Sequence, residues 1–181
     1  FQWRDEPIPD KPVVLIQTEL GDVKLQLDAQ RAPKTVKNFL HYVHQGFYND
    51  GVFFRTVTAA NQPDDDVKIA VLQARADPTR ADQLLPAIPL ERTRDTGLKH
   101  RNGTVSMARM GPDTAQDHFF ICVGDQPELD FGGKRNRDGQ GFAAFGQVIE
   151  GMGIVRRLHS SAAEGQMLKP PIRIQRAIRE N

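Results

Sequence analysis

The residue best suited to chemistry in this sequence is an arginine that interrupts an apolar, strand-like run. Arg55 lies among Phe53, Phe54 and Val57 within residues 51–57. A guanidinium stays charged in proteins and is rarely buried without a partner. Such an arginine either forms a structural ion pair or presents fixed donors to a ligand beside an apolar pocket. Residue type alone favours the ion pair and leaves the second interpretation open.

Metal binding is not indicated by the other clusters of reactive side chains. His41 and His44 have helical i, i+3 spacing, but no third ligand lies near them in the sequence. The acidic run at residues 64–66 lacks the alternating ligands and the glycine of a calcium-binding loop. We therefore interpret the histidines as ordinary helix residues and the acidic run as a solvated turn. We expect no metal and no cofactor.

Hydrolase and nucleotide chemistry are also disfavoured. Ser106 and His118 could join an aspartate in a catalytic triad, but the sequence contains no Gly-x-Ser-x-Gly elbow. The glycine-rich, basic segment 132–141 matches neither the dinucleotide-binding nor the P-loop spacing, so we predict an exposed loop. Cys122 lies in an apolar run and is interpreted as a core residue.

Length and composition indicate one domain, with no excess of charge that would favour nucleic acid and no segment that could span a membrane. The chain has 181 residues, a net charge of +1 and one cysteine. No apolar run approaches the roughly 18 residues that span a bilayer. We expect a flexible arm at residues 1–12, a single domain at 13–181, a monomer, and neither nucleic-acid binding nor membrane insertion. The start at Phe1 predicts a processed N-terminus and hence a periplasmic or secreted protein, with the cytoplasm as the alternative.

The pattern of apolar residues predicts a mainly β protein. Residues 13–28 are typical of a β-hairpin, and a helix is expected from Pro33 to Gly46, with a second at about 151–159. Further strands are predicted at 52–57, 67–73, 103–108, 118–123 and 142–148, and Pro170–Pro171 is expected to break the chain before a last strand at about 172–174. Many short strands with two helices favour a closed antiparallel β-barrel flanked by two α-helices.

Seven sequence blocks occur in the order found in cyclophilins. They are Ala32–Phe39 with Gly46–Tyr48, Phe53–Arg55, Val71–Gln73, Gly103–Ala108, His118–Ile121, Leu129–Asp130 and Phe145–Val148. The chain resembles the cyclophilin family of peptidyl-prolyl isomerases over nearly its whole length, and its long loops resemble those of a bacterial, exported branch. The resemblance implies the cyclophilin-like closed antiparallel β-barrel flanked by two α-helices.

The resemblance also implies which residues form the site. Arg55 matches the catalytic arginine, and Gln73 matches the glutamine that orients it and meets the substrate backbone. Rotation about an X–Pro bond breaks amide conjugation against a barrier of about 20 kcal/mol, so the implied chemistry is donation to the prolyl nitrogen, without a nucleophile. The implied substrate-binding residues are Phe54, Val71, Ala108, Arg109, Phe120, Leu129 and Phe142.

Several site positions differ from the residue types usual in the family. These are Phe54 and Phe142 (usually His), Ala70 (Phe), Val71 (Met), Arg109 (Asn), His118 (Gln) and Glu128 (Trp). The small Ala70 leaves the pocket floor either wider or filled by Ile69 or by a phenylalanine from elsewhere. In the family the backbone of the usual Asn binds the substrate, so this contact is expected to survive the change of side chain to Arg109. Glu128 predicts weak sensitivity to cyclosporin.

The resemblance implies a peptidyl-prolyl cis-trans isomerase that acts on proline-containing peptides and unfolded proteins and assists protein folding. The alternative is a proline-peptide binding or chaperone module with weak or no turnover, which the changes at Phe54, Ala70, Glu128 and Phe142 favour. A small-ligand barrel is disfavoured, because the Phe- and Leu-rich strands indicate a barrel filled by its own side chains.

Overall fold

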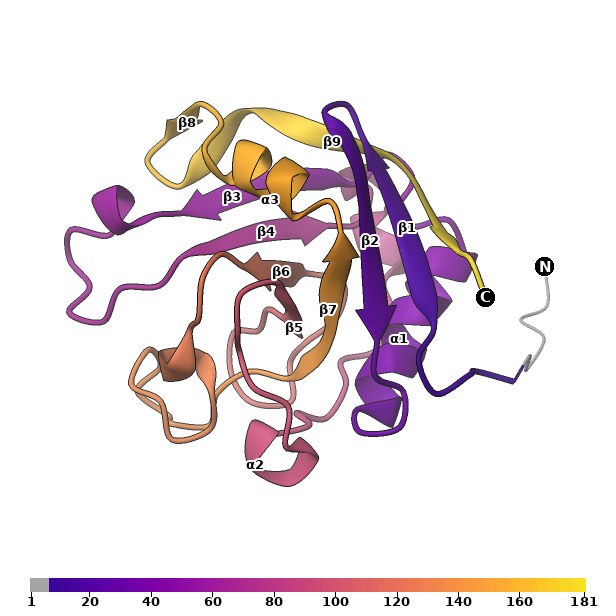
Figure 1. The fold of residues 1–181 in the computed structure, drawn as a ribbon, viewed down its shortest axis with the longest axis horizontal. Coiled ribbons are helices and arrows are strands. Elements are labelled where there is room, and N and C mark those ends of the chain that lie inside the picture. Colours follow the sequence, from indigo (N-terminus) through magenta and orange to yellow (C-terminus); the bar gives the residue numbers. More distant parts are fainter. Residues whose placement is uncertain (1–6) are drawn as a thin grey trace.

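The computed structural model describes residues 7–181, and the fold is a β-barrel with helices packed against it (Figure 1). The strands are β1 (Val13–Thr18), β2 (Gly21–Leu27), β3 (Val52–Val57), β4 (Val71–Arg75), β5 (Thr104–Met107), β6 (Phe119–Cys122), β7 (Ala144–Glu150), β8 (Ala163–Glu164) and β9 (Met167–Arg179). The α-helices are α1 (Pro33–His44), α2 (Thr93–Thr96) and α3 (Met152–His159), and short 3-10 helices lie at Ala59–Asn61, Pro78–Gln83 and Pro127–Leu129.

The strands close into a barrel in the order β1-β2-β7-β5-β6-β4-β3-β9, because β9 pairs with β1 as well as with β3. All these pairings are antiparallel, and β8 adds a two-residue hairpin strand to β9. The predicted fold class is confirmed, and the two predicted helices are α1 and α3. They lie on different sides of the barrel (Figure 1). None of the helices in the described part of the chain is long and apolar enough to cross a membrane.

The local sequence explains why the first elements form where they do. In β2 the buried Val23, Leu25 and Leu27 alternate with more exposed residues, as a half-buried strand requires. Pro33 lies in the first turn of α1, where its missing N–H removes no helical hydrogen bond. Gly46 has φ +70°, a conformation that lets the chain turn away after the helix.

Residues 1–6 of the predicted arm lie outside the described residues, whereas the rest of the arm follows the barrel. The carbonyl oxygen of Pro12 accepts a hydrogen bond from Leu27 N (2.8 Å), and that of Asp10 accepts one from Ala29 N (3.0 Å). Ile8 packs against the main core. This part of the arm is therefore attached to β2 and the segment that follows it.

Two strands, β4 and β9, begin more than two residues away from their predicted starts. β4 begins at Val71 rather than at residue 67, because the Gln62 side chain hydrogen-bonds both backbone groups of Ile69 in place of a neighbouring strand (2.6 and 3.1 Å). Pro170 and Pro171 lie inside β9 rather than ahead of it. They fall where the register between β3 and β9 shifts, so the ladder does not need the N–H that proline lacks.

The buried apolar residues form two clusters that β6 separates. Phe119 belongs to the main core, which the barrel shares with α1 and α3. Phe120, the next residue, points to the opposite face of the strand and joins a smaller cluster of Val57, Ile69, Val71, Phe120, Cys122 and Leu129. Burial raises the pKa of the Cys122 thiol, in agreement with the prediction of a core residue. The smaller cluster forms the floor of the site described next.

Candidate active site

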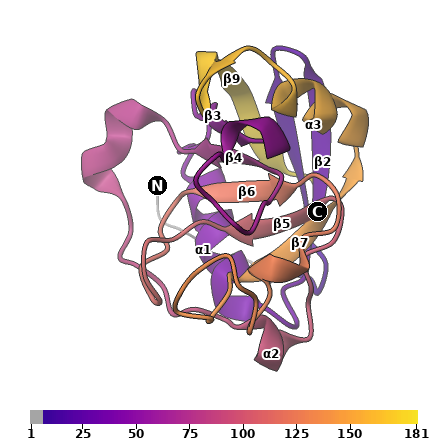
Figure 2. The same cartoon turned by 90° about the vertical axis from the view of Figure 1, so that its left-hand side faces the viewer.

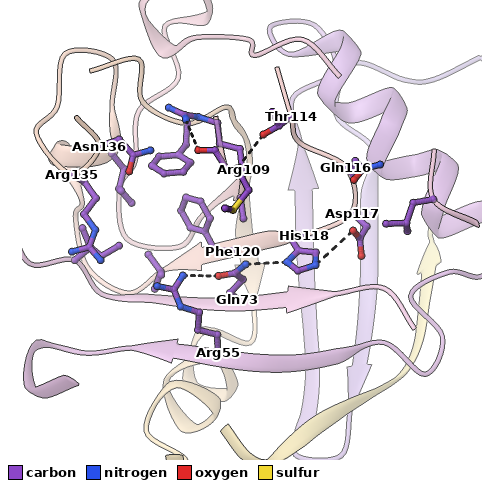
Figure 3. A pocket seen from close by; sticks show the side chains of 17 residues that line it. Arg55, Gln73, Arg109, Thr114, Gln116, Asp117, His118, Phe120, Arg135 and Asn136 are labelled. Atoms are coloured by element: carbon purple, nitrogen blue, oxygen red, sulfur yellow. Dashed lines mark hydrogen bonds and ion pairs between the residues drawn. The ribbon is translucent and has the colours of Figure 1, made fainter. Parts of the chain in front are cut away.

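A cavity of about 440 Å³ lies over the smaller apolar cluster, between the ends of β3, β4 and β6 and the loops around residues 108–118 and 129–142 (Figure 3). It brings together almost all the site residues expected from the sequence: Arg55, Val71, Gln73, Ala108, Arg109, Phe120, Leu129 and Phe142. Phe54 does not line the cavity. Its ring packs edge-on against His118, with 5.3 Å between ring centroids, so it borders the site behind that histidine.

The cavity floor is apolar and large enough for a proline ring. Phe120 and Leu129 are almost fully buried, and the ring of Phe142 stands perpendicular to that of Phe120, with centroids 5.5 Å apart. Ile69 lines the floor beside Val71, so Ile69 supplies the apolar bulk that Ala70 lacks. The floor is therefore closed by aliphatic and aromatic side chains.

Two neutral amides hold Arg55. Its Nη1 donates to Gln73 Oε1 (2.9 Å), while its Nε and Nη2 both donate to Gln166 Oε1 (3.0 and 2.7 Å). No ion pair joins Arg55 to a carboxylate of residues 7–181, so the structural ion pair favoured from residue type alone is wrong. These bonds use three of the five guanidinium N–H groups and leave two for a ligand.

Burial lowers the pKa of Arg55, and the positive charge of Arg135 lowers it further against the opposing effect of Asp65. An arginine nevertheless stays protonated at neutral pH. The site therefore contains a half-buried cation that forms no ion pair with a carboxylate of residues 7–181, at the edge of an apolar floor.

A row of polar side chains continues from Arg55 across the cavity (Figure 3). Gln73 Nε2 lies 3.2 Å from His118 Nδ1, and His118 Nε2 lies 3.8 Å from Asp117 Oδ1. Burial lowers the pKa of His118, with Asp117 opposing the shift and Arg75 adding to it. Neutral His118 can accept the Gln73 N–H at Nδ1, which leaves Gln73 Oε1 to accept from Arg55.

The loop at residues 131–141 extends from the barrel, as the sequence predicts (Figure 2), and its residues Arg135 and Asn136 also form one rim of the cavity (Figure 3). Arg109 holds the loop from below: its Nη1 and Nη2 donate to the Asp138 carboxylate (2.9 and 3.1 Å), and its Nε and Nη2 donate to Gly141 O (2.9 and 2.6 Å). The hydrogen bond from Arg109 holds the pKa of Asp138 below its usual value. The guanidinium also lies 4.8 Å from the centre of the Phe142 ring. The side chain of Arg109 is thus a structural tether.

Arg135 extends from the same loop to the opposite side of the cavity. Its Nη1 donates to Gln62 Oε1 (2.8 Å) and to Val67 O (2.7 Å), and its Nη2 lies 3.5 Å from Asp65 Oδ2. These contacts connect the loop to the segment before β4. Glu128 is not part of the cavity lining, and its carboxylate accepts a hydrogen bond from Lys134 N (2.8 Å).

A Ser–His–Asp arrangement does occur in the structure, but it involves His100 rather than His118. His100 Nδ1 lies 2.8 Å from Asp130 Oδ1, and His100 Nε2 lies 2.8 Å from Ser106 Oγ. Ser106 is completely buried, so its hydroxyl cannot reach a substrate. The His100 ring stacks on Phe120 at 6.0 Å between centroids, and the arrangement therefore supports the cavity floor.

Sequence reasoning misses Gln166 and Arg135, and it also misses other residues of the cavity lining: Leu84, Met110, Thr114, Gln116, Asp117 and Asn136. Gln166 lies in the hairpin between β8 and β9, 111 positions from Arg55, and nothing in its neighbourhood in the sequence indicates the contact. Arg135 lies in a segment whose composition predicts a loop but not the surface on which the loop folds. The only signal available for it is the concentration of basic residues in that segment.

Comparisons with known proteins agree with this fold. Residues 13–179 match the family described as cyclophilin type peptidyl-prolyl cis-trans isomerase/CLD. The chain is 36% identical over 152 residues to peptidyl-prolyl cis-trans isomerase A of Dickeya dadantii, covering 83% of this chain and 73% of that protein. It is 32% identical over 151 residues to peptidyl-prolyl cis-trans isomerase B of Escherichia coli, covering 83% and 85%.

The fold is shared with a crystal structure of a Cryptosporidium parvum cyclophilin type peptidyl-prolyl cis-trans isomerase, with a TM-score of 0.75 and 24% sequence identity over 94% of this chain and 98% of that one. The closed barrel thus defines a cyclophilin-like protein. The chain belongs to the cyclophilin-type peptidyl-prolyl cis-trans isomerase family, and its class of enzyme is an isomerase.

Proposed function

We propose that this chain isomerises X–Pro bonds of peptides and unfolded proteins by donating hydrogen bonds from Arg55 to the twisting amide. One observation carries the proposal: the Arg55 guanidinium is held by the neutral amides of Gln73 and Gln166 at the edge of an apolar floor that accommodates a proline ring. The cation is fixed in place, and its charge remains available to a substrate.

The physical basis is the change in the prolyl nitrogen during rotation. In a planar amide the nitrogen lone pair is delocalised into the carbonyl, and the barrier of about 20 kcal/mol reflects the loss of that conjugation. In the twisted state the lone pair returns to nitrogen and becomes a hydrogen-bond acceptor. A donor that meets it there binds the transition state better than either planar isomer, which is the requirement for catalysis.

The apolar floor supplies the second requirement, which is to hold the proline while the preceding residue turns. Phe120, Leu129 and Phe142 form this floor of aromatic and aliphatic groups in the cavity. A related structure, that of the Cryptosporidium parvum protein, was solved in the presence of the dipeptide Ala-Pro. The presence of that dipeptide supports proline-containing peptides as the ligand class that we propose for the cavity.

The test is NMR exchange spectroscopy on a short proline peptide with the wild type, Arg55→Ala and Arg156→Ala. Arg156 is exposed on α3 and serves as the matched control. We expect the wild type and Arg156→Ala to accelerate interconversion and Arg55→Ala to lose at least about tenfold, about 1.4 kcal/mol of transition-state stabilisation. A wild type that binds the peptide without accelerating its interconversion would instead support a binding or chaperone module.

Three further assignments stay predictions: a role in protein folding, an exported location and a monomeric state. The role in folding is tested by the refolding rate of a client protein whose refolding is limited by proline isomerisation. The exported location is tested by fractionation of cells that express the full-length protein. The monomeric state is tested by the mass of the protein in solution. Weak cyclosporin sensitivity, expected from Glu128, is tested by inhibition of the same peptide exchange.

A further inference from the structure

We propose that Gln166 is a positioning residue for Arg55, and that it acts by orienting the guanidinium without neutralising it. The proposal rests on the proposed function, because it assigns a role within the same site. Gln166 contacts Arg55 directly but does not line the cavity, so it acts on a substrate only through Arg55.

The contact between the two side chains fixes the plane of the guanidinium. Gln166 Oε1 accepts from both Nε (3.0 Å) and Nη2 (2.7 Å), which are on the same edge of the group. Gln73 Oε1 accepts from Nη1 at 2.9 Å. Because the planar guanidinium is held both at its Nε/Nη2 edge and at Nη1, it cannot rotate without losing one of these hydrogen bonds. The remaining N–H groups therefore point in fixed directions.

The amide of Gln166 is itself held in one orientation. Its Nε2 donates to Asn61 O (3.1 Å), so the carbonyl end faces Arg55. Its backbone oxygen accepts from Thr56 N (2.8 Å), which ties the hairpin to β3 beside the arginine. The Asn61 side chain in turn donates to Gly165 O (3.2 Å) and to Thr56 O (2.8 Å). Gln166 thus has partners on both sides, as a positioning residue requires.

The chemistry of the partner explains why an amide suits this place. A carboxylate would bind the guanidinium more strongly, but it would also form an ion pair and reduce the positive field at the prolyl nitrogen. Both side chains that hold Arg55 within the described residues are glutamines, and the positive charge of Arg135 lowers its pKa against the opposing effect of Asp65. The arrangement keeps the arginine rigid and its charge unpaired.

A purely structural role for Gln166 makes a different prediction. A change of the Gln166 side chain removes its bonds to Arg55 and the one from its Nε2 to Asn61 O, but the backbone bond from Thr56 N to Gln166 O and the Asn61 side-chain bonds, which attach the hairpin to β3, remain. A change at the side chain therefore separates the positioning of Arg55 from the attachment of the hairpin.

The experiment compares Gln166→Met, which keeps the length of the side chain but not its acceptor, with Gln166→Glu, which keeps the acceptor and adds a charge. Gln175→Met on the exposed face of β9 is the matched control. Peptide exchange rates by NMR, peptide affinity by titration and the Arg55 Nε–H resonance are measured for each. We expect Gln166→Met to lower kcat at least about fivefold with affinity changed less than twofold, and to shift the Nε–H resonance. We expect Gln166→Glu to keep the hydrogen-bonded Nε–H resonance of Arg55. We expect it still to lower kcat, because the new carboxylate forms an ion pair with the Arg55 guanidinium.

The double variant Arg55→Ala/Gln166→Met shows whether Gln166 acts through the arginine. We expect its rate to equal that of Arg55→Ala alone, because a positioning residue has no effect once its target is gone. Losses that add in the double variant would overturn the proposal, and so would a Gln166→Met enzyme as active as Gln175→Met. In either case the proposed function stands if Arg55→Ala is inactive. A wild type without activity would overturn the proposed function itself.

Discussion

The Gln73 side chain has a different hydrogen-bonding partner at each end of its amide: Oε1 accepts from Arg55, and Nε2 faces Nδ1 of His118. An amide can satisfy both only when the histidine nitrogen is an acceptor. If His118 is protonated, its Nδ1–H faces the Gln73 NH₂ group, and turning the amide over brings that NH₂ group to Arg55 instead. The protonation state of His118 therefore affects the orientation of Arg55.

This dependence predicts an acid limit to the activity. Burial lowers the pKa of His118, and Asp117 and Arg75 are the charged groups that influence it. The neutral form is thus present at pH 7, and activity falls as the pH decreases below the usual histidine value of about 6.5. We expect the kcat–pH profile of the wild type to show this acid limb, and His118→Gln, which keeps an acceptor for Gln73, to be flat there. An acid limb that persists in His118→Gln would show that another group causes it.

For single residues, the sequence predicts the side chains that line the cavity better than the side chains that position them. Arg55, Gln73 and Phe120 are assigned from the resemblance to cyclophilins, because each lies in one of the short blocks that carry it. Gln166 is not, because its contact with Arg55 depends on the register of β9 against β3, which only the folded barrel defines.

Among the elements, the loop at residues 131–141 is predicted as a loop, but its contact with the cavity is not. Glycines and charges indicate an exposed loop, and the loop does leave the barrel (Figure 2). Its return over the cavity depends on Arg109, a residue outside the loop whose side chain reaches Asp138 and Gly141. Composition indicates that a segment is a loop, but the place where it folds back depends on such distant partners.

The tether predicts that Asp138→Asn affects substrate binding more than folding. The amide keeps the shape of the carboxylate but has no charge and only one acceptor oxygen, so one of the two bonds from Arg109 is lost and the other weakens, while those to Gly141 O remain. We expect faster hydrogen exchange over residues 132–141, a severalfold weaker peptide affinity, and a melting temperature close to that of the wild type. Asp22→Asn, on the exposed side of β2, is the control. Unchanged exchange in the loop would show that the contacts with Gly141 suffice.

In the whole molecule, two neighbouring phenylalanines on β6 serve different purposes. The Phe119 ring meets Phe39 and Tyr48, each at 5.4 Å between centroids, in the main core. The Phe120 ring lies on the other face of the strand, on the floor of the cavity. Stability and peptide binding can therefore be changed separately at adjacent positions.

We expect Phe119→Ala to lower the free energy of unfolding by about 3–5 kcal/mol, because it leaves a void among packed rings. Phe120→Ala should cost less, since its site opens to the cavity, but should weaken peptide binding. Urea denaturation and NMR titration of a proline peptide measure the two effects. A Phe120→Ala protein that is folded and binds the peptide as the wild type does would contradict the assignment of the floor.

The closure of the barrel by β9 has a consequence for the protein during its own synthesis. Val71, Phe120 and Leu129, which form the floor, all precede the hairpin that brings Gln166 to Arg55, and β9 is also the strand that joins β1 to close the barrel. Contacts between such distant segments form only after the later segment has been made. A chain still emerging from the ribosome without this hairpin has neither a closed barrel nor an oriented arginine. The isomerase therefore cannot act on its own 12 prolines in the nascent chain, and it becomes active only when β9 is in place.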